Sequence, residues 1–226
     1  MEISIIIPTL NESECIGRLI DRLLSNLSIT FEIIVVDGGS TDDTITICQQ
    51  RGVTVLESKP SRAIQQNVGA ANAQYDYLYF LHADTLPPSS LQTDLAQCIE
   101  QGVIAACYRS AYETNSLILR VNAFFTRFYW LVARGGDQSL LIQKKAFFEL
   151  GKFDETYVIM EEYPLLEQLM KKKQLTILPK SILISTRKYD NRSWLKVSRA
   201  NYKAFRLFRK NVDSRTIKRV YKEALS

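Results

Sequence analysis

Acidic side chains lie where hydrophobic runs of this 226-residue chain stop. The clearest case is 77–81, a run of apolar and aromatic residues that predicts a buried parallel strand. His82 and Asp84 follow it directly. In open α/β sheets, ligands bind in the crevice beyond the carboxyl ends of the strands. Because a carboxylate is a hard oxygen ligand, we expect Asp84 to bind a divalent cation, Mg²⁺ or Mn²⁺.

The residues around this acid leave alternatives open. Asp84 also fits the N-cap of the next helix, although Pro87 and Pro88 intervene. His82 is the only histidine of the chain, and a lone histidine is more often structural than catalytic. Its position two residues before Asp84 in an extended segment puts both side chains on one side. His82 is therefore a second candidate for contacting the metal or a phosphate.

Other carboxylates follow the same pattern. Glu12 comes after a first strand, and Asp37 ends a second strand at a Gly-Gly turn, where a backbone can approach a ligand closely. Asp37 can accept hydrogen bonds from a base or a ribose, or it can close an Asx turn. Glu161 and Glu162 begin a later helix, where the helix dipole alone would favour acids.

The elements that must position these residues alternate along the first half of the chain. We expect strands at 3–7, 31–36, 53–56, 77–81 and 103–108, with helices at 14–26, from 41 onward, at 62–73 and at 91–101. This order predicts a parallel sheet with right-handed crossovers. Further on, we expect strands at 139–143, 176–178 and 182–185, and helices at 145–150, 161–173, 194–210 and 214–225.

Residues 115–134 read as one long helix. Apolar residues face one way, and Arg120, Arg127 and Arg134 recur every seven residues on another side. These charges argue against a membrane-spanning segment. A core helix and an interfacial helix both fit the pattern.

Composition and charge limit the protein class. Hydrophobic residues make up 46% and charged residues 23%, as in soluble globular proteins. The four cysteines form no C-x-x-C pair, and the start of the chain lacks the pattern of a signal peptide, so we expect a reduced, cytoplasmic protein. Residues 187–226 hold 13 Lys or Arg against three Asp or Glu. This basic extension suggests an anionic partner, or else a solvated helical face.

Six motifs resemble glycosyltransferase family 2, whose members have the GT-A fold and use nucleotide-diphospho-sugars. They are IIIPTLNE (5–12), IIVVDGGSTDDT (33–44), RAIQQNVGA (62–70), FLHADT (80–85), GDQ (136–138) and MEE (160–162). The resemblance covers about residues 3–210 and is greatest to the small soluble branch with His-Ala-Asp and Gly-Asp-Gln motifs. It implies a Rossmann-like GT-A domain over 1–186, with a mostly parallel sheet, and a basic helical extension over 187–226.

The resemblance also implies roles for individual residues. Asp84 is the metal-binding acid, with His82 where the family has a second acid. Glu162 is the first choice for the general base and Glu161 the second, although the family has Asp where Glu162 stands. The nucleotide is assigned to Pro8, Thr9, Glu12, Asp37, Arg62 and Ala83, and the acceptor or sugar to Gly136, Asp137 and Gln138.

The function implied is metal-dependent, inverting sugar transfer. A metal at Asp84 neutralises the leaving diphosphate, and Glu162 deprotonates an acceptor hydroxyl that attacks the anomeric carbon. The donor is a nucleotide-diphospho-sugar, and a lipid-linked acceptor would give the basic C-terminal helices a peripheral membrane contact at the inner face. No nucleic-acid partner is expected.

Other classes fit less well. Residues 8–12 lack the glycine-rich loop of a nucleotidyltransferase, His82 replaces the nucleophilic Asp of a dehalogenase-type phosphatase, and no G-x-G-x-x-G marks a dehydrogenase. The non-enzyme alternative is a weak or inactive GT-A fold that binds nucleotides or a membrane surface.

Overall fold

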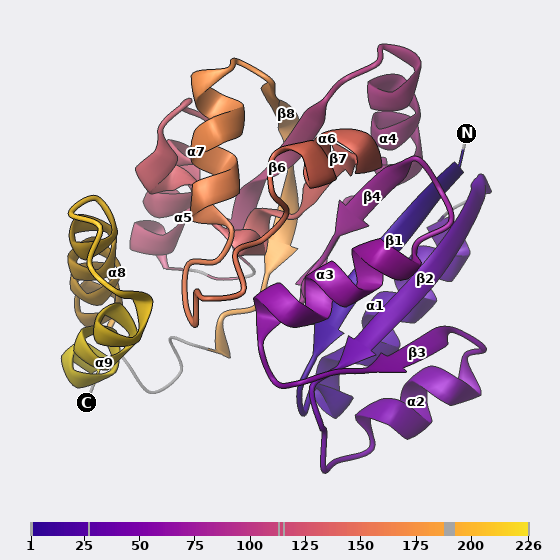
Figure 1. The fold of residues 1–226 in the computed structure, drawn as a ribbon, viewed down its shortest axis with the longest axis horizontal. Coiled ribbons are helices and arrows are strands. Elements are labelled where there is room, and N and C mark those ends of the chain that lie inside the picture. Colours follow the sequence, from indigo (N-terminus) through magenta and orange to yellow (C-terminus); the bar gives the residue numbers. More distant parts are fainter. Residues whose placement is uncertain (1, 27, 113, 115, 188–192, 226) are drawn as a thin grey trace.

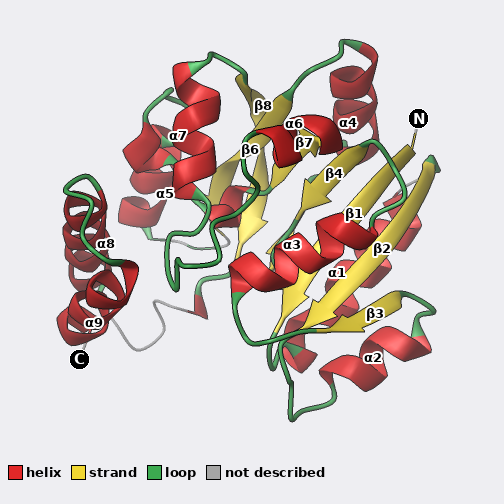
Figure 2. Cartoon of the chain, viewed as in Figure 1, coloured by secondary structure: helices red, strands yellow, loops and turns green. Residues whose placement is uncertain are grey.

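The central sheet forms from short β-branched and aromatic runs, and helices cover both of its faces (Figures 1 and 2). This computed structural model describes residues 2–26, 28–112, 114, 116–187 and 193–225. The strands are β1 (Glu2–Thr9), β2 (Thr30–Asp37), β3 (Thr54–Glu57), β4 (Tyr77–Phe80), β5 (Thr85–Leu86), β6 (Ala105–Tyr112), β7 (Leu140–Gln143) and β8 (Leu175–Ile184).

The strand order is β3-β2-β1-β4-β7-β6-β8-β5. Strands β1 to β4 are parallel to one another, β7 is antiparallel to both β4 and β6, and β5 is antiparallel to β8. Since β6 and β8 are parallel, only β5 and β7 of the described strands run against the rest. The expected mostly parallel α/β sheet is therefore confirmed.

The helices are α1 (Ser13–Asn26), α2 (Thr44–Gln50), α3 (Arg62–Asn72), α4 (Leu91–Glu100), α5 (Leu117–Phe125), α6 (Lys144–Glu149), α7 (Tyr163–Lys171), α8 (Trp194–Phe208) and α9 (Ser214–Leu225), with short 3₁₀ turns η1 (Leu131–Ala133) and η2 (Gly136–Gln138). Helices α1, α2 and α4 pack on one face of the sheet, while α3, α6 and α7 pack on the other. None of the described helices is long and apolar enough to cross a membrane.

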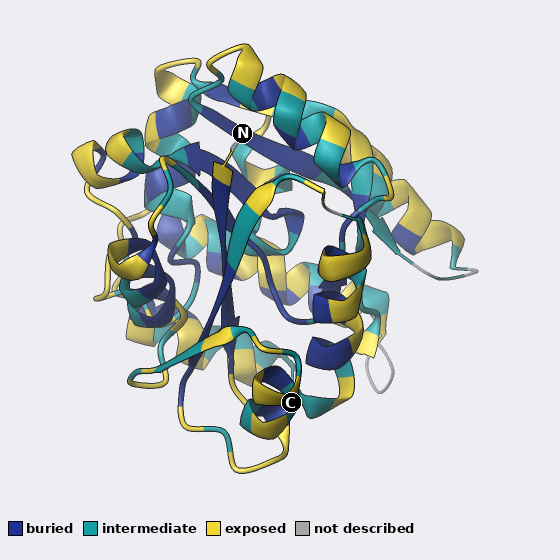
Figure 3. Ribbon diagram, turned by 90° about the vertical axis from the view of Figure 1, so that its right-hand side faces the viewer, coloured by how far each residue is buried: buried dark blue, intermediate teal, exposed yellow. Residues whose placement is uncertain are grey.

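Strand β1 lies at the centre of the sheet and is buried from Ile3 to Thr9. Figure 3 shows such strands as dark ribbons between partly exposed helices. Each fully buried Ile contributes roughly 1.5–3 kcal/mol through removal of apolar surface from water. This rigid strand fixes the position of the residues at its end.

Several expected boundaries are wrong. We expected Pro8 to end the first strand, but β1 continues through it, because pairing with β4 stops at Ile6 and Pro8 has only β2 as a neighbour. The two strands expected around 176–185 are one strand, β8. The two-residue strand β5 is absent from the expected elements. Asp84 is not the N-cap of the helix that follows it, because the N-cap residue of α4 is Ser90.

The long helix expected at 115–134 is also wrong. Helix α5 ends at Phe125, and Thr126 is buried at the break. The Thr126 hydroxyl accepts a hydrogen bond from the Ser110 amide (3.0 Å) and donates one to Ala123 O (2.6 Å). Arg134 donates to Thr126 O and Phe128 O. These tertiary bonds replace the helical hydrogen bonds that the local pattern favours.

The C-terminal helices α8 and α9 pack on each other and on the loop before α7, beside the sheet domain (Figure 1). Their inward apolar residues include Ala204, Phe208 and Ile217, which contact the segment from Tyr157 to Tyr163. The basic extension therefore buries its apolar stripe against the body of the protein.

Candidate active site

A cavity of about 410 Å³ opens where β1 ends and where the chain leaves β4. Its volume is typical of small-molecule sites. Further walls come from the start of α3, the loop at 157–161 and Lys218 of α9. The predicted site residues that line it are Pro8, Thr9, Glu12, Arg62, His82, Ala83, Asp84 and Glu161. Parallel strand ends thus bring together residues far apart in the sequence, as expected.

Asp37 lies behind this cavity and is fully buried. Its carboxylate accepts hydrogen bonds from the amides of Gly39 (2.8 Å) and Ser40 (2.7 Å) and from the Thr9 hydroxyl (3.2 Å). Gly39 has φ +94°, which this turn requires. The Asx-turn alternative describes these contacts, so Asp37 holds the loop in this structure and does not face the cavity.

Gln65 of α3 is a residue that sequence reasoning missed. Its buried side-chain amide donates to Thr9 O (2.7 Å) and Val36 O (2.8 Å), at the ends of β1 and β2. The bonds tie α3 to two strand ends and fix the cavity wall. The sequence signal that could have found Gln65 is a polar residue on the face of α3 whose other members, such as Ala63, Gly69 and Ala70, are small and buried.

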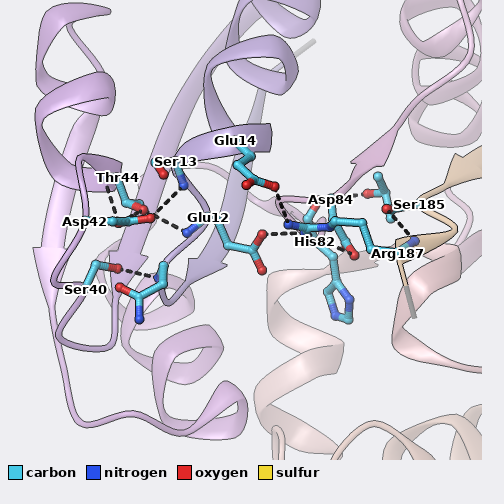
Figure 4. A network of polar contacts seen from close by, with 12 residues as sticks. Glu12, Ser13, Glu14, Ser40, Asp42, Thr44, His82, Asp84, Ser185 and Arg187 are labelled. Carbon is cyan, nitrogen blue, oxygen red and sulfur yellow. Dashed lines mark hydrogen bonds and ion pairs between the residues drawn. The ribbon is translucent and has the colours of Figure 1, made fainter. Parts of the chain in front are cut away.

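Arg187 is the second missed residue, and it contacts two predicted site acids (Figure 4). Its Nη2 lies 2.7 Å from Glu12 Oε2 and 3.7 Å from Asp84 Oδ2, and its Nη1 lies 3.7 Å from Glu14 Oε2. The hydrogen bond to Glu12 raises the pKa of Arg187, which keeps it charged. A cation from the chain itself therefore stands beside Asp84.

His82 points away from this cluster. It is 8% exposed, and its Nδ1 lies 3.5 Å from Asp137 Oδ1. Its ring packs so closely on Gly136 that a Cβ there would lie 2.9 Å from His82 Cε1 and Nε2. The structure thus joins the residue after β4 to the Gly-Asp-Gln turn.

Gln138 of this turn has a structural environment. It is buried and donates to Ala133 O (2.8 Å) and Ser110 Oγ (3.2 Å). Asp137, by contrast, faces His82, and Gly136 presents its amide to Glu162. The three motif residues therefore contact different partners, and none of them lies on the wall of the large cavity.

Glu161 and Glu162 directly precede α7, and their side chains line two different cavities. Met160 has φ +62°, a left-handed conformation that redirects the chain. Glu161 is buried and lines the large cavity, whereas Glu162 lines a smaller cavity of about 20 Å³, which has room for about one water. The helix begins later than expected, at Tyr163, with Glu162 as its N-cap residue.

The Glu162 side chain makes no capping bond to α7; its Oε1 accepts the Gly136 amide hydrogen at 2.8 Å. Burial, followed by the nearby Glu161 carboxylate, raises the pKa of Glu162 to about 7. A carboxyl group with this pKa can take up and release a proton near neutral pH. Helix-dipole preference alone does not account for this placement.

Arg62 stands among the acids at the start of α3. The surrounding protein partly desolvates the Arg62 guanidinium, which lowers its pKa, but the nearby acids Glu161, Asp137, Glu162 and Asp84 raise this pKa beyond the ordinary value. Its side chain remains exposed to the open cavity. A fixed cation with free access suits an anionic ligand such as a diphosphate.

The described residues include no group of three or more His, Cys, Asp or Glu arranged to hold a metal ion. Asp84 offers one carboxylate, and its side chain is 34% exposed at the cavity. Mg²⁺ is usually held by one or two carboxylates together with substrate phosphates and water, and Mn²⁺ takes the same oxygen ligands. The residues fit a cation that arrives with a diphosphate, and they do not form a complete site on their own.

The family model described as "Glycosyl transferase family 2" matches residues 4–216, nearly the whole chain. The chain belongs to glycosyl transferase family 2. An uncharacterized glycosyltransferase of Haemophilus influenzae is 27% identical to this family member over 190 residues. That match covers 77% of this chain and 64% of the H. influenzae protein, so the chain spans somewhat less than two thirds of that relative's length.

Solved structures place this family member in the GT-A fold. The S. aureus TarS 1–349 complex with UDP-GlcNAc has a TM-score of 0.64 at 16% identity, and the match covers 99% of this chain and 71% of TarS 1–349. Mannosyltransferase PcManGT from Pyrobaculum calidifontis, in complex with GDP-Man and Mn²⁺, has a TM-score of 0.65 at 18% identity, covering 88% of this chain and 60% of that chain. At these identities the likeness concerns the fold alone.

Proposed function

We propose that this family member transfers a sugar from a nucleotide-diphospho-sugar to an acceptor hydroxyl, with inversion at the anomeric carbon. The observation that carries the proposal is one cavity of about 410 Å³, in which Glu12 and Asp84, beyond the carboxyl ends of the parallel strands β1 and β4, are combined with Arg62 and Glu161. Structures of the same fold bind UDP-GlcNAc and GDP-Man, which supports a nucleotide-sugar donor.

The residues around Asp84 bind the donor diphosphate in this proposal. Asp84 holds Mg²⁺ or Mn²⁺, which when bound neutralises charge on the leaving diphosphate. Arg62 and Lys218 add fixed positive charge on the cavity wall. Pro8, Thr9 and Ala83 supply the uncharged part of the wall, against which the nucleoside lies.

Glu162 removes the proton from the acceptor hydroxyl. The acceptor oxygen then attacks the anomeric carbon while the bond from this carbon to the diphosphate breaks on the opposite face. A single displacement therefore inverts the anomeric configuration. The Gly136 amide orients Glu162, while burial and then the nearby Glu161 carboxylate raise the pKa of Glu162 to about 7, so that it can act as a base near neutral pH. Glu161 is the second candidate for the base because it lines the large cavity.

The test measures binding and turnover over a panel of uridine and guanosine diphosphates and their sugars. We expect Mn²⁺-dependent binding, with release of the nucleoside diphosphate by donor hydrolysis or transfer. Asp84→Asn should reduce metal-dependent binding about tenfold or more. Asp76→Asn is the matched control, since Asp76 is exposed at the opposite end of β4.

Binding that is independent of Mn²⁺, or equal in wild type and Asp84→Asn, contradicts the metal assignment. Binding without any turnover across the panel favours the alternative, a nucleotide-binding protein with a transferase fold. The specific observation behind that alternative is Arg187, whose charge already stands beside Glu12 and Asp84.

The acceptor and location belong to the proposal as well. We infer a lipid-linked acceptor at the inner face of the membrane for a protein of the cytoplasm, without nucleic acid as a partner. The basic C-terminal helices contribute charge to such a contact through outward residues such as Lys196, Lys203 and Arg206, since their apolar stripe packs on the domain.

A further inference from the structure

Residues 117–132 carry an exposed apolar surface that the active site does not use. Of the 14 exposed large hydrophobic residues that the structure describes, eight lie in this short segment. They are Leu117, Ile118, Val121, Phe124, Phe125, Tyr129, Trp130 and Val132, each at least 43% exposed. A cluster of this kind marks an interaction site, whereas single exposed hydrophobic residues need no explanation.

The aromatic part of this surface is ordered by its own ring contacts. Phe128 and Trp130 stack with centroids 4.7 Å apart, Phe125 and Trp130 stack at 6.4 Å, and the Arg127 guanidinium lies 3.7 Å above the Phe124 ring. Only one residue of α5, Leu119, is buried. The helix therefore presents apolar side chains outward, so of the two expectations for this segment the interfacial helix fits and the core helix does not.

The charges of the segment have one sign. From 114 to 136 the sequence contains no Asp or Glu, and Arg120 and Arg127 are exposed within the aromatic surface. Trp, Tyr and Phe beside Arg suit the interface of a lipid bilayer, where rings lie at headgroup level and guanidinium groups pair with anionic headgroups.

We propose that residues 117–132 dock this protein onto a membrane that contains anionic lipids. A second copy of the chain is a poorer occupant, because a two-fold contact places a patch against itself. The same segment of the other copy would offer Arg120 and Arg127 no acid to pair with.

The position of the surface fits this role. The chain passes from η1 through Arg134 to Gly136, whose amide binds Glu162. The 3₁₀ turn η1, which ends the segment, packs on α7, the helix that follows Glu162. Tyr163 Oη donates to Arg134 O at 2.7 Å. Docking would therefore bring the candidate base close to the lipid surface; this consequence, unlike the docking itself, rests on the proposed function.

Vesicle flotation of the full chain tests the docking. We expect wild type to float with phosphatidylcholine vesicles that contain phosphatidylglycerol, and much less with phosphatidylcholine alone or at high salt. Phe125→Ser with Trp130→Ser, and separately Arg120→Glu with Arg127→Glu, should each weaken the partition at least about tenfold. Leu24→Ser with Phe148→Ser is the matched control, two exposed apolar residues of α1 and α6 that belong to neither proposed membrane contact, and should float like wild type.

Thermal melts and nucleotide binding of each variant show that the fold is intact, and they separate a failure of docking from a failure of the proposed function. The proposal is overturned if wild type does not float with the anionic vesicles, or if the control with Leu24→Ser and Phe148→Ser loses as much as the aromatic variant. It is also overturned if light scattering finds a wild-type dimer that the aromatic variant converts to a monomer.

Discussion

The Gly136 amide donates a hydrogen bond to Glu162 Oε1 at 2.8 Å, and this contact joins two motifs that lie 26 residues apart. It fixes the orientation of the carboxylate that we propose as the base. The same glycine packs against the His82 ring, so one small residue connects the end of β4, the Gly-Asp-Gln turn and the start of α7. Each contact can be tested by substitution.

Glu162→Gln should lower turnover by about 10²–10⁴-fold while leaving nucleotide binding almost unchanged, because the amide cannot accept a proton. Glu161→Gln should have a smaller effect, and Glu100→Gln, at an exposed end of α4, should have none. Steady-state kinetics with the best donor of the panel measure this. If Glu161→Gln is the inactive variant and Glu162→Gln is not, the base is Glu161.

The pKa of Glu162 predicts two pH dependences of opposite sign. For wild type, kcat/KM for the donor should fall about tenfold per pH unit below about pH 7, because the base becomes protonated. The unfolding free energy should instead fall as pH rises from about 4.5 to about 7, because ionising a carboxyl with a raised pKa disfavours the folded state. Denaturant titrations at several pH values should show that Glu162→Gln removes this part of the slope; an unchanged slope would contradict the pKa.

Gly136→Ala should lower turnover about 10²-fold, because its Cβ would lie 2.9 Å from the His82 ring and displace either the ring or the amide that orients Glu162. Gly135→Ala is the matched control: its Cβ would meet only Glu162 Oε1, at 4.0 Å, and its φ of −175° is open to any residue. Kinetics and thermal melts of both variants give the comparison. Equal activity of the two would show that this packing does not matter.

Arg187→Ala should increase the affinity of the nucleotide-free protein for Mn²⁺ about fivefold, because it removes a partly screened positive charge 3.7 Å from Asp84. The same variant should bind nucleoside diphosphates more weakly once the metal is present. Calorimetric titration measures both. Arg51→Ala, which breaks the ion pair with Asp21 (2.7 Å) away from the cavity, should change neither affinity; an effect as large as that of Arg187→Ala would point to long-range charge alone.

Gly69→Ala should destabilise the fold by about 1–3 kcal/mol, although Gly to Ala normally stabilises a helix by roughly 0.5–1 kcal/mol. Its Cβ would lie 2.4 Å from Ile6 Cγ2 and 3.2 Å from Val36 Cγ2, so α3 would have to move off the sheet. Gly17→Ala, also in a helix, meets Arg51 Nη2 at 3.0 Å and Ile47 Cγ2 at 3.3 Å, contacts that small side-chain shifts relieve, and should change stability by less than about 1 kcal/mol. Urea denaturation separates the two; a Gly69→Ala protein as stable as wild type would refute the close packing.

Elements with strong local patterns were predictable. The β-branched and aromatic runs located β1, β2 and β4, and the small-residue run located α3 within one residue. The family and the GT-A fold followed from six ordered motifs and are confirmed. The predicted boundaries of helices and strands were wrong where contacts with distant residues outweigh the local pattern. Helix α5 ends at Thr126 because the Ser110 amide binds the Thr126 hydroxyl. Pro8 stays in β1 because the neighbouring strand β4 has already ended there.

For the candidate site, strand order and the points where hydrophobic runs stop were enough to predict that Glu12 and Asp84 follow the ends of parallel strands. The sequence predicts that Glu12, Asp37, Asp84, Glu161 and Glu162 converge at one edge of the sheet. Glu12, Asp84 and Glu161 do line one cavity, whereas Asp37 and Glu162 do not. The partners of these side chains, in contrast, became visible only in the folded chain. Arg187 reaches Glu12 across 175 residues of sequence, and Asp37 turns inward to its own loop. Such pairings depend on side-chain directions and packing between distant segments, which no local spacing encodes.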